Sequence, residues 1–142
     1  MGDEAGASHN DDTATITIAD VAGNEDDGAI TVTVTLDNAV DGGFDVNVST
    51  ADGTATTANS DYTAVTNQTL TFAGTSGESE TFTVTPTADV TAEANETIIV
   101  TMSGLVPVTV ASGDLNVTDT ATVTINNDDD ISISVDDVAV AE

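Results

Sequence analysis

The sequence predicts an all-β fold in which two antiparallel sheets pack face to face. Three observations support it. Short segments alternate apolar and polar residues at a period of two, β-branched Thr and Val dominate those segments, and clusters of Gly, Asn and Asp separate them. Alternation at this period places apolar side chains on one face of a strand, so each segment is predicted to be a half-buried strand. No helix longer than one turn is expected.

Seven segments carry the strand pattern. In chain order they are 13–20, 29–36, 44–50, 68–72, 80–87, 97–103 and 117–126. The first three read TATITIAD, AITVTVTL and FDVNVST, and the last four read QTLTF, ETFTVTPT, TIIVTMS and VTDTATVTIN. Seven short strands at this spacing predict a seven-strand antiparallel immunoglobulin-like β-sandwich, although no Cys or Trp is present to mark a true immunoglobulin domain.

The predicted core consists of the apolar residues of these segments, and the interleaved threonines are expected to face water. The core residues are Ile30, Val32, Val34, Leu36, Phe44, Val46, Val48, Leu70, Phe72, Phe82, Val84, Ile98, Val100, Val123 and Ile125. A chain of 142 residues is long enough for one domain with such a core and too short for two ordinary ones.

A partial internal repeat predicts the domain organisation. Residues 9–25 read HNDDTATITIADVAGNE and residues 126–142 read NNDDDISISVDDVAVAE, with eight of seventeen positions identical at an offset of 117 residues. Tandem modules joined by an acidic junction explain this match. We therefore expect residues 1–12 to be an added leader and the end of a preceding repeat or linker. Residues 13–130 are then one sandwich, and residues 131–142 are the start of the next repeat.

The charge of the chain excludes some partners and implies another. Twenty-six acidic residues stand against no Lys or Arg, so the formal net charge is -26 and no internal salt bridge to a Lys or Arg side chain can form. Nucleic acid and anionic membranes are excluded as partners because both require basic patches. No apolar run is long enough to insert in a membrane. Clustered carboxylates would repel one another, which indicates a divalent cation from solution.

Strand parity places four acidic segments at one end of the predicted sandwich. The chain changes pole with every strand, so segments 24–28, 60–62, 89–96 and 128–130 share a pole. Oxygen ligands in excess, without clustered His or Cys, favour Ca²⁺ over Zn²⁺ or Mg²⁺. The opposite pole carries acids that we interpret as surface charge: Asp37, Asp41, Asp45 and Asp114.

Several motifs in their order and spacing resemble the Calx-beta family. They are TADGTA at 50–55, DY at 61–62, LTF at 70–72 followed by a Gly-Glu turn, EANE at 93–96 and VTINNDDD at 123–130. The resemblance spans about residues 16 to 130. It implies an immunoglobulin-like sandwich of the kind found in sodium-calcium exchangers, in integrin β4 and in tandem in large extracellular and bacterial surface proteins.

The resemblance also implies a set of calcium ligands and two or more Ca²⁺ ions. The matching positions are Glu25, Asp61, Asp89, Glu93, Glu96, Asp128, Asp129 and Asp130. One position departs from the exchanger pattern, because Ala88 stands where the first Asp of a pair would precede Asp89. Fewer ions or weaker binding than in a full cluster are therefore expected. Asp52, in the DGTA turn, is interpreted as a residue that shapes the backbone.

These features predict a calcium-binding structural repeat of a large extracellular adhesin on a bacterial surface, with neighbouring repeats of the same chain as its partners. No nucleophile lies beside a base and His9 is isolated, so catalysis is not expected. Two alternatives stay open: a calcium-sensor domain like those of the exchangers, and a domain that binds glycan or protein directly. Weak self-association through the strand at 131–140 is a further prediction.

Overall fold

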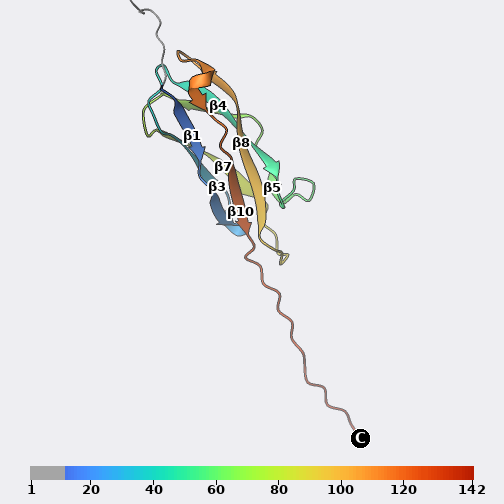
Figure 1. Ribbon diagram of the computed structural model, residues 1–142. Coiled ribbons are helices and arrows are strands. Elements are labelled where there is room, and N and C mark those ends of the chain that lie inside the picture. The colour runs from blue at the N-terminus through green and yellow to red at the C-terminus, as the bar shows by residue number, and fades with distance from the viewer. Residues whose placement is uncertain (1–11) are drawn as a thin grey trace, which may run out of the picture.

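The computed structural model describes residues 12–142, and these residues form a β-sandwich of two five-stranded sheets (Figure 1). The strands are β1 (Ala14–Ile18), β2 (Val21–Asn24), β3 (Ile30–Leu36), β4 (Phe44–Asp52), β5 (Tyr62–Thr63), β6 (Gln68–Phe72), β7 (Ser79–Pro86), β8 (Glu96–Pro107), β9 (Leu115–Asn116) and β10 (Ala121–Asn126). Two single-turn 3-10 helices are η1 (Glu25–Asp27) and η2 (Ser112–Asp114). One sheet has the order β5-β7-β3-β1-β9, and the other has the order β2-β10-β8-β4-β6.

The predicted all-β sandwich is confirmed, with a different strand count. Each of the seven predicted segments contains a strand, although the last begins at Ala121 and the sixth continues to Pro107. The three additional strands β2, β5 and β9 are short, and two of them pair in parallel: β2 with β10 and β9 with β1. Such short edge strands are defined by a partner far away in the sequence, so local alternation does not predict them.

The core lies between the sheets and contains every residue predicted for it. Ile16, Ile18 and Leu115 are also buried, as are Val40 and Tyr62. At one end of the core the Phe44 and Phe72 rings stack with centroids 4.8 Å apart, because β4 and β6 place these two residues opposite each other. In the described part of the chain, no helix is long and apolar enough to cross a membrane.

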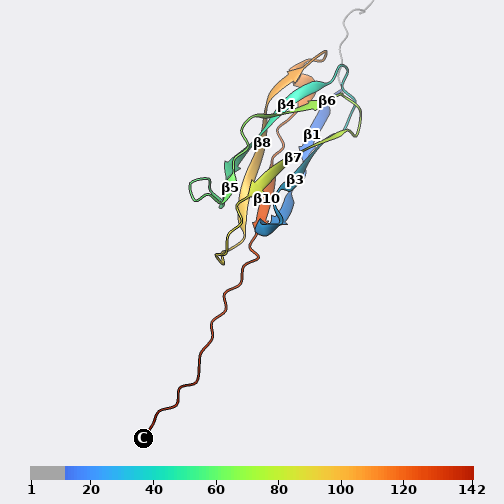
Figure 2. The same ribbon diagram turned by 180° about the vertical axis from the view of Figure 1, so that it is seen from behind.

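The sheet topology brings three chain segments to one end of the sandwich. β2 and β10 run parallel with Asn24 beside Asn126, so η1 and the residues after β10 leave the sheet at the same level. β8 runs antiparallel to β10 with Glu96 opposite Ile125, which places the β7–β8 loop at this end too. Figure 2 shows these segments meeting where β10 continues into an extended chain that leads away from the sandwich. We call this end the acidic pole.

The predicted domain organisation assigns both ends of the chain to segments outside the sandwich. The predicted leader at residues 1–12 lies, except for Asp12, outside the described residues. Residues 127–130, which we call the junction, and residues 131–142, which we call the tail, contain no strand and no helix. All tail residues are exposed. The assignment of the tail to a following repeat stays a prediction.

A carboxylate closes the turn between β6 and β7. The Glu78 carboxylate accepts hydrogen bonds from the backbone N–H groups of Ala73 (2.8 Å), Gly74 (2.9 Å) and Thr75 (3.1 Å). Burial alone would raise the pKa of Glu78, but these three donors lower it below its ordinary value. Gly74 is required here because its φ is +98° and an added Cβ would clash with the Val40 carbonyl oxygen.

Glu78→Ala is therefore expected to lower the free energy of unfolding by about 1–3 kcal/mol, because the three backbone donors lose their acceptor. The loss should be the same in calcium and in chelator, since Glu78 belongs to a turn remote from the acidic pole. Urea denaturation of the variant measures this effect, with Glu80→Ala in the adjacent strand β7 as its control. Equal stability of the two variants would contradict it.

Candidate cation site

Glu25 is the only buried residue with a charged side chain in the described part of the chain. It begins η1, directly after β2 turns away from β10, and its side chain is 6% exposed. Its Oε1 atom is buried and has no hydrogen-bond donor. A buried carboxylate without a hydrogen-bond donor or a positive partner is costly, because it has lost its water without compensation.

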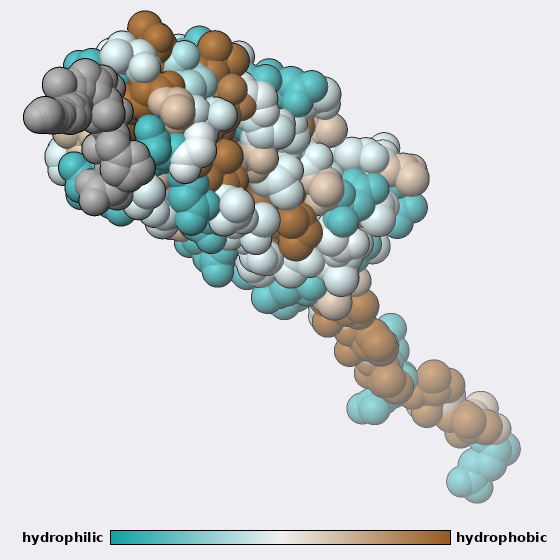
Figure 3. Space-filling model, turned by 45° about the horizontal axis from the view of Figure 1, so that its top comes forward, coloured by the Kyte–Doolittle hydropathy of each residue, from teal (hydrophilic) through white to brown (hydrophobic). Residues whose placement is uncertain are grey.

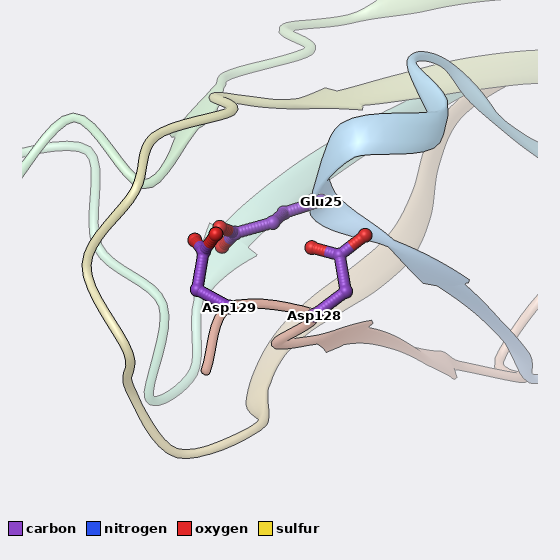
Figure 4. A group of neighbouring side chains, drawn as sticks. All are labelled: Glu25, Asp128 and Asp129. Atoms are coloured by element: carbon purple, nitrogen blue, oxygen red, sulfur yellow. The ribbon is translucent and has the colours of Figure 1, made fainter. Parts of the chain in front are cut away.

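Asp128 and Asp129, directly after β10, meet Glu25 at the acidic pole. One carboxylate oxygen from each of the three residues lies within 4.8 Å of the others. Figure 4 shows the Glu25 and Asp129 carboxylates facing each other, with Asp128 beside them. The Asp129 Oδ2 atom is likewise buried without a donor, whereas Asp128 is exposed. Two facing carboxylates repel each other, and a proton or a cation between them removes this repulsion.

The electrostatics of this cluster penalise its charged form. Burial, the contact with Asp129 and the charges of Asp89, Asp129 and Asp128 together raise the pKa of Glu25 from 4.5 to about 7. The pKa of Asp128 is also raised, first by burial and then by the charge of Asp26. With neither Lys nor Arg in the chain, a bound cation is the available means of keeping all three groups ionised near neutral pH.

Without metal, the stability of the domain is expected to fall as pH rises from about 4.5 to about 7. In this window the folded state holds a proton on Glu25 that the unfolded state has released. The stabilisation is thus complete below about 4.5 and is lost as pH passes the folded pKa near 7. Melting curves in chelator across this range measure the effect, and Glu25→Gln should reduce the slope. A melting temperature that rises toward pH 7 would contradict the assignment.

A second group of predicted ligands lies at the start of β8. Glu96 is half-buried, and its pKa is raised by burial and by the charges of Asp61 and Glu93. Asp61 already accepts hydrogen bonds from the Thr56 backbone N–H at 2.7 Å and from the Thr56 hydroxyl at 3.4 Å. The charges of Asp61 and Glu93 therefore act on Glu96, but none of these three acids belongs to the close cluster around Glu25.

The other two predicted ligands are placed less closely. Asp89 in the β7–β8 loop is exposed, and its Oδ1 atom accepts a hydrogen bond from the Thr91 N–H at 2.6 Å. Its charge nevertheless reaches Glu25 and helps to raise the pKa of that residue. Asp130 is exposed and lies outside the close cluster. The predicted set of eight is thus divided by the structure into an inner cluster of three and five surrounding acids.

Asparagine side chains tie the β7–β8 loop to the junction. The Asn127 Oδ1 atom accepts a hydrogen bond from the Glu93 N–H at 3.0 Å, and the Asn127 N–H donates to Asn95 Oδ1 at 3.0 Å. The Asn127 side-chain amide also donates to the Asp129 carbonyl oxygen at 2.8 Å. These bonds hold Asp128 and Asp129 close to the sandwich, so the two carboxylates are positioned by the fold.

Two acidic residues near the cluster were not among the predicted ligands. Asp26 and Asp27 follow Glu25 in η1, and their charges raise the pKa of Asp128. They directly follow Glu25 in the sequence, and this acidic run was the signal that could have identified them as residues of the site. The interpretation of Asp52 as a residue that shapes the turn is confirmed, because its Oδ1 atom accepts hydrogen bonds from the Tyr62 hydroxyl at 2.7 Å and the Thr57 N–H at 3.1 Å.

The fold and the site together define a class of protein: an immunoglobulin-like sandwich with a carboxylate cluster where its last strand ends. The sequence profile of the Calx-beta domain matches residues 9–129. The chain therefore belongs to the Calx-beta family, as the motifs in the sequence predicted. No curated protein sequence matches the chain.

Solved structures agree with this fold. The apo form of the Calx CBD1 domain superposes with a TM-score of 0.66 at 22% identity, covering 83% of this chain and 100% of that domain. The calcium binding domain CBD12 of CALX1.1 gives 0.62 at 22% identity, covering 80% of this chain and 44% of that longer one. The Calx CBD2 domain gives 0.60 at 15% identity, covering 80% and 86% of the two chains. At these identities the likeness shows a shared fold.

Proposed function

We propose that this domain is a calcium-binding structural repeat of a large extracellular adhesin, in which Ca²⁺ stiffens the sandwich and its junction to the next repeat. The observation that carries the proposal is a pair of buried carboxylate oxygens, Glu25 Oε1 and Asp129 Oδ2, that have no donor at the point where the chain leaves β10. A cation between them would satisfy both atoms and cancel the repulsion at this pole.

The ligand chemistry favours calcium. Ca²⁺ binds six to eight oxygens at about 2.3–2.6 Å, so two oxygens on one ion lie up to about 5 Å apart. The three inner oxygens, from Glu25, Asp128 and Asp129, lie within 4.8 Å of one another and fit one such ion. Asp89 would supply negative charge nearby. A second ion, if bound, would use the group formed by Asp61, Glu93 and Glu96.

The position of the cluster supports a role at the junction. Asp128 and Asp129 are inner-cluster residues and also belong to the four residues that lead from β10 to the tail. An ion held by these residues and by Glu25 would restrict the direction in which the chain leaves the sandwich. The absence of every Lys and Arg favours a saline exterior, where screening weakens the repulsion between repeats.

Hydrogen exchange at the junction tests this role. With saturating calcium, the amides of residues 127–130 are expected to exchange at least about tenfold more slowly than in chelator, because local opening must then release the ion. Amides of β3, the central strand of its sheet, serve as the internal reference. Equal exchange at the junction with and without calcium, under conditions where calorimetry shows binding, would reject the stiffening role.

A calcium-sensor role is the second candidate, and membership of a family that includes a calcium binding domain, CBD12 of CALX1.1, supports it. Affinity separates the two roles. An extracellular structural module is expected to bind with a dissociation constant of about 10⁻⁴ to 10⁻³ M, whereas a cytosolic sensor binds at about 10⁻⁷ to 10⁻⁵ M. Isothermal titration calorimetry of the whole chain measures this constant. A submicromolar value would favour the sensor.

A further inference from the structure

The tail carries a stripe of apolar side chains that the sandwich does not cover. Ile131, Ile133, Val135, Val138 and Val140 are between 74% and 90% exposed, and they account for most of the exposed large hydrophobic residues in the described chain. Figure 3 shows hydrophobic residues, in brown, along much of the tail. The stripe has a period of two with one interruption, because three positions separate Val135 from Val138.

The same pattern occurs in β1 and β2, where its physical cause is visible. Ile16 and Ile18 on β1 are buried, and Val21 on β2 is half-buried in the other sheet, so the interruption marks the bend at which the chain changes sheets. At the offset of the internal repeat, these three residues correspond to Ile133, Val135 and Val138.

The bend itself is also repeated. Asp20 accepts a hydrogen bond from the Thr122 N–H at 2.9 Å and thereby fixes the bend against β10. Asp137 stands at the corresponding position of the tail, and the next two residues, Val and Ala, are identical in both copies. The tail thus repeats both the core-facing residues of the β1–β2 segment and the side chain that anchors its bend.

One residue of the tail does not fit the place of β1 and β2 in this sandwich. Val140 corresponds to Gly23, and a Cβ added at Gly23 would lie 2.7 Å from Cγ1 and 3.0 Å from Cδ1 of Ile30. Ile30 is a core residue with 6% exposure and little freedom to move. At the other end Ile131 corresponds to Ala14, a core residue that lines an open groove together with Val110 and Leu115.

We propose that the tail is the β1–β2 ribbon of a second sandwich of this family, and that Val140 excludes it from this sandwich and from identical copies. The partner surface is then a β-sandwich with a smaller residue where Ile30 stands here. This inference concerns packing and does not depend on calcium. Weak self-association through residues 131–140 stays a prediction, and the Gly23–Ile30 contact opposes one route to it, the exchange of β1–β2 between identical chains.

A graft tests both parts of the proposal. In the first variant, residues 14–22 and 24–25 of the whole chain receive the sequence of their tail counterparts, and Gly23 is kept. The second variant adds Gly23→Val. A matched control carries the first graft with the order of residues 14–18 changed from ISISV to IISVS, which keeps the composition but places Ser at positions 16 and 18. Circular dichroism and thermal unfolding are measured in calcium and in chelator.

The first graft is expected to fold cooperatively with a melting temperature within about 10 °C of the wild type. The second should melt at least about 5 °C lower than the first, and the control should not fold. In the wild-type background, Gly23→Val should cost less when Ile30→Ala is present, because the clashing atoms are then removed. An unfolded first graft would overturn the ribbon assignment, and equal stability of both grafts would overturn the exclusion by Val140.

The result is distinguishable from a failure of the proposed calcium role. If the grafts behave as expected but calcium leaves every melting temperature unchanged, the calcium role fails and the ribbon assignment stands. If calcium stabilises the wild type but the first graft is unfolded in both conditions, the ribbon assignment fails alone.

Discussion

Saturating calcium is expected to raise the melting temperature of this domain by about 15 °C or more over its value in chelator. Each site occupied at 100 times its dissociation constant adds about 2.7 kcal/mol to the free energy of unfolding. For a domain of this size, 1 kcal/mol corresponds to roughly 3–6 °C, so two sites are sufficient for the shift. Relief of the repulsion among the inner carboxylates acts in the same direction.

Thermal unfolding with calcium, with magnesium and with chelator measures this shift, and calorimetry under the same conditions counts the ions. Magnesium is the matched control, because Mg²⁺ retains its water and needs a more regular octahedral site. A shift with calcium that magnesium does not reproduce would support a calcium site. Identical melting curves in calcium and chelator would mean that the acids of the pole are merely solvated, and would reject the proposed function.

Glu25→Gln is expected to change the stability in opposite directions with and without calcium. In chelator at pH 8 the variant should melt about 5 °C higher than the wild type, because a neutral amide replaces a buried charge whose pKa is raised to about 7. In calcium it should melt about 10 °C lower than the wild type, because the ion loses an inner carboxylate.

Asp41→Asn provides the matched control for this reversal. It also removes one negative charge, but from an exposed position that was predicted to belong to the opposite pole. A general decrease in net charge would affect both variants equally, whereas a specific site predicts a reversal only for Glu25→Gln. If the variant and the wild type gained the same stability from calcium, Glu25 would not be a ligand.

Much of the fold was predictable because it follows from local alternation. Residues such as Val32, Phe44 and Val123 belong to segments of period two, and a slip of one position would expose the whole apolar face. Short strands such as β2 and β9 were not predictable, because each exists only through a parallel partner distant in the sequence. The Gly and Asn residues of β2 even favour a turn when considered alone.

The location of the candidate site was predictable, but the arrangement of its residues was not. Charge, strand parity and the Calx-beta motifs together identified an acidic pole and eight candidate ligands. They could not distinguish Asp129, which is in the inner cluster, from Asp130, which is outside it. Side chains of consecutive residues in an extended chain point in different directions, and the sequence does not show which of the two faces the cluster. The sequence also could not show that Asp61 already has hydrogen-bond donors in Thr56.

By itself the sequence determined a β-sandwich whose acidic side chains have no basic partner to neutralise them. Its alternation fixes which residues are buried, and its composition leaves a cation as the partner of any carboxylate cluster. The tertiary structure alone decided that Glu25 would be buried and would face Asp129. That contact depends on the parallel pairing of β2 with β10, which joins residues about a hundred positions apart, and no local pattern encodes an interaction over such a separation.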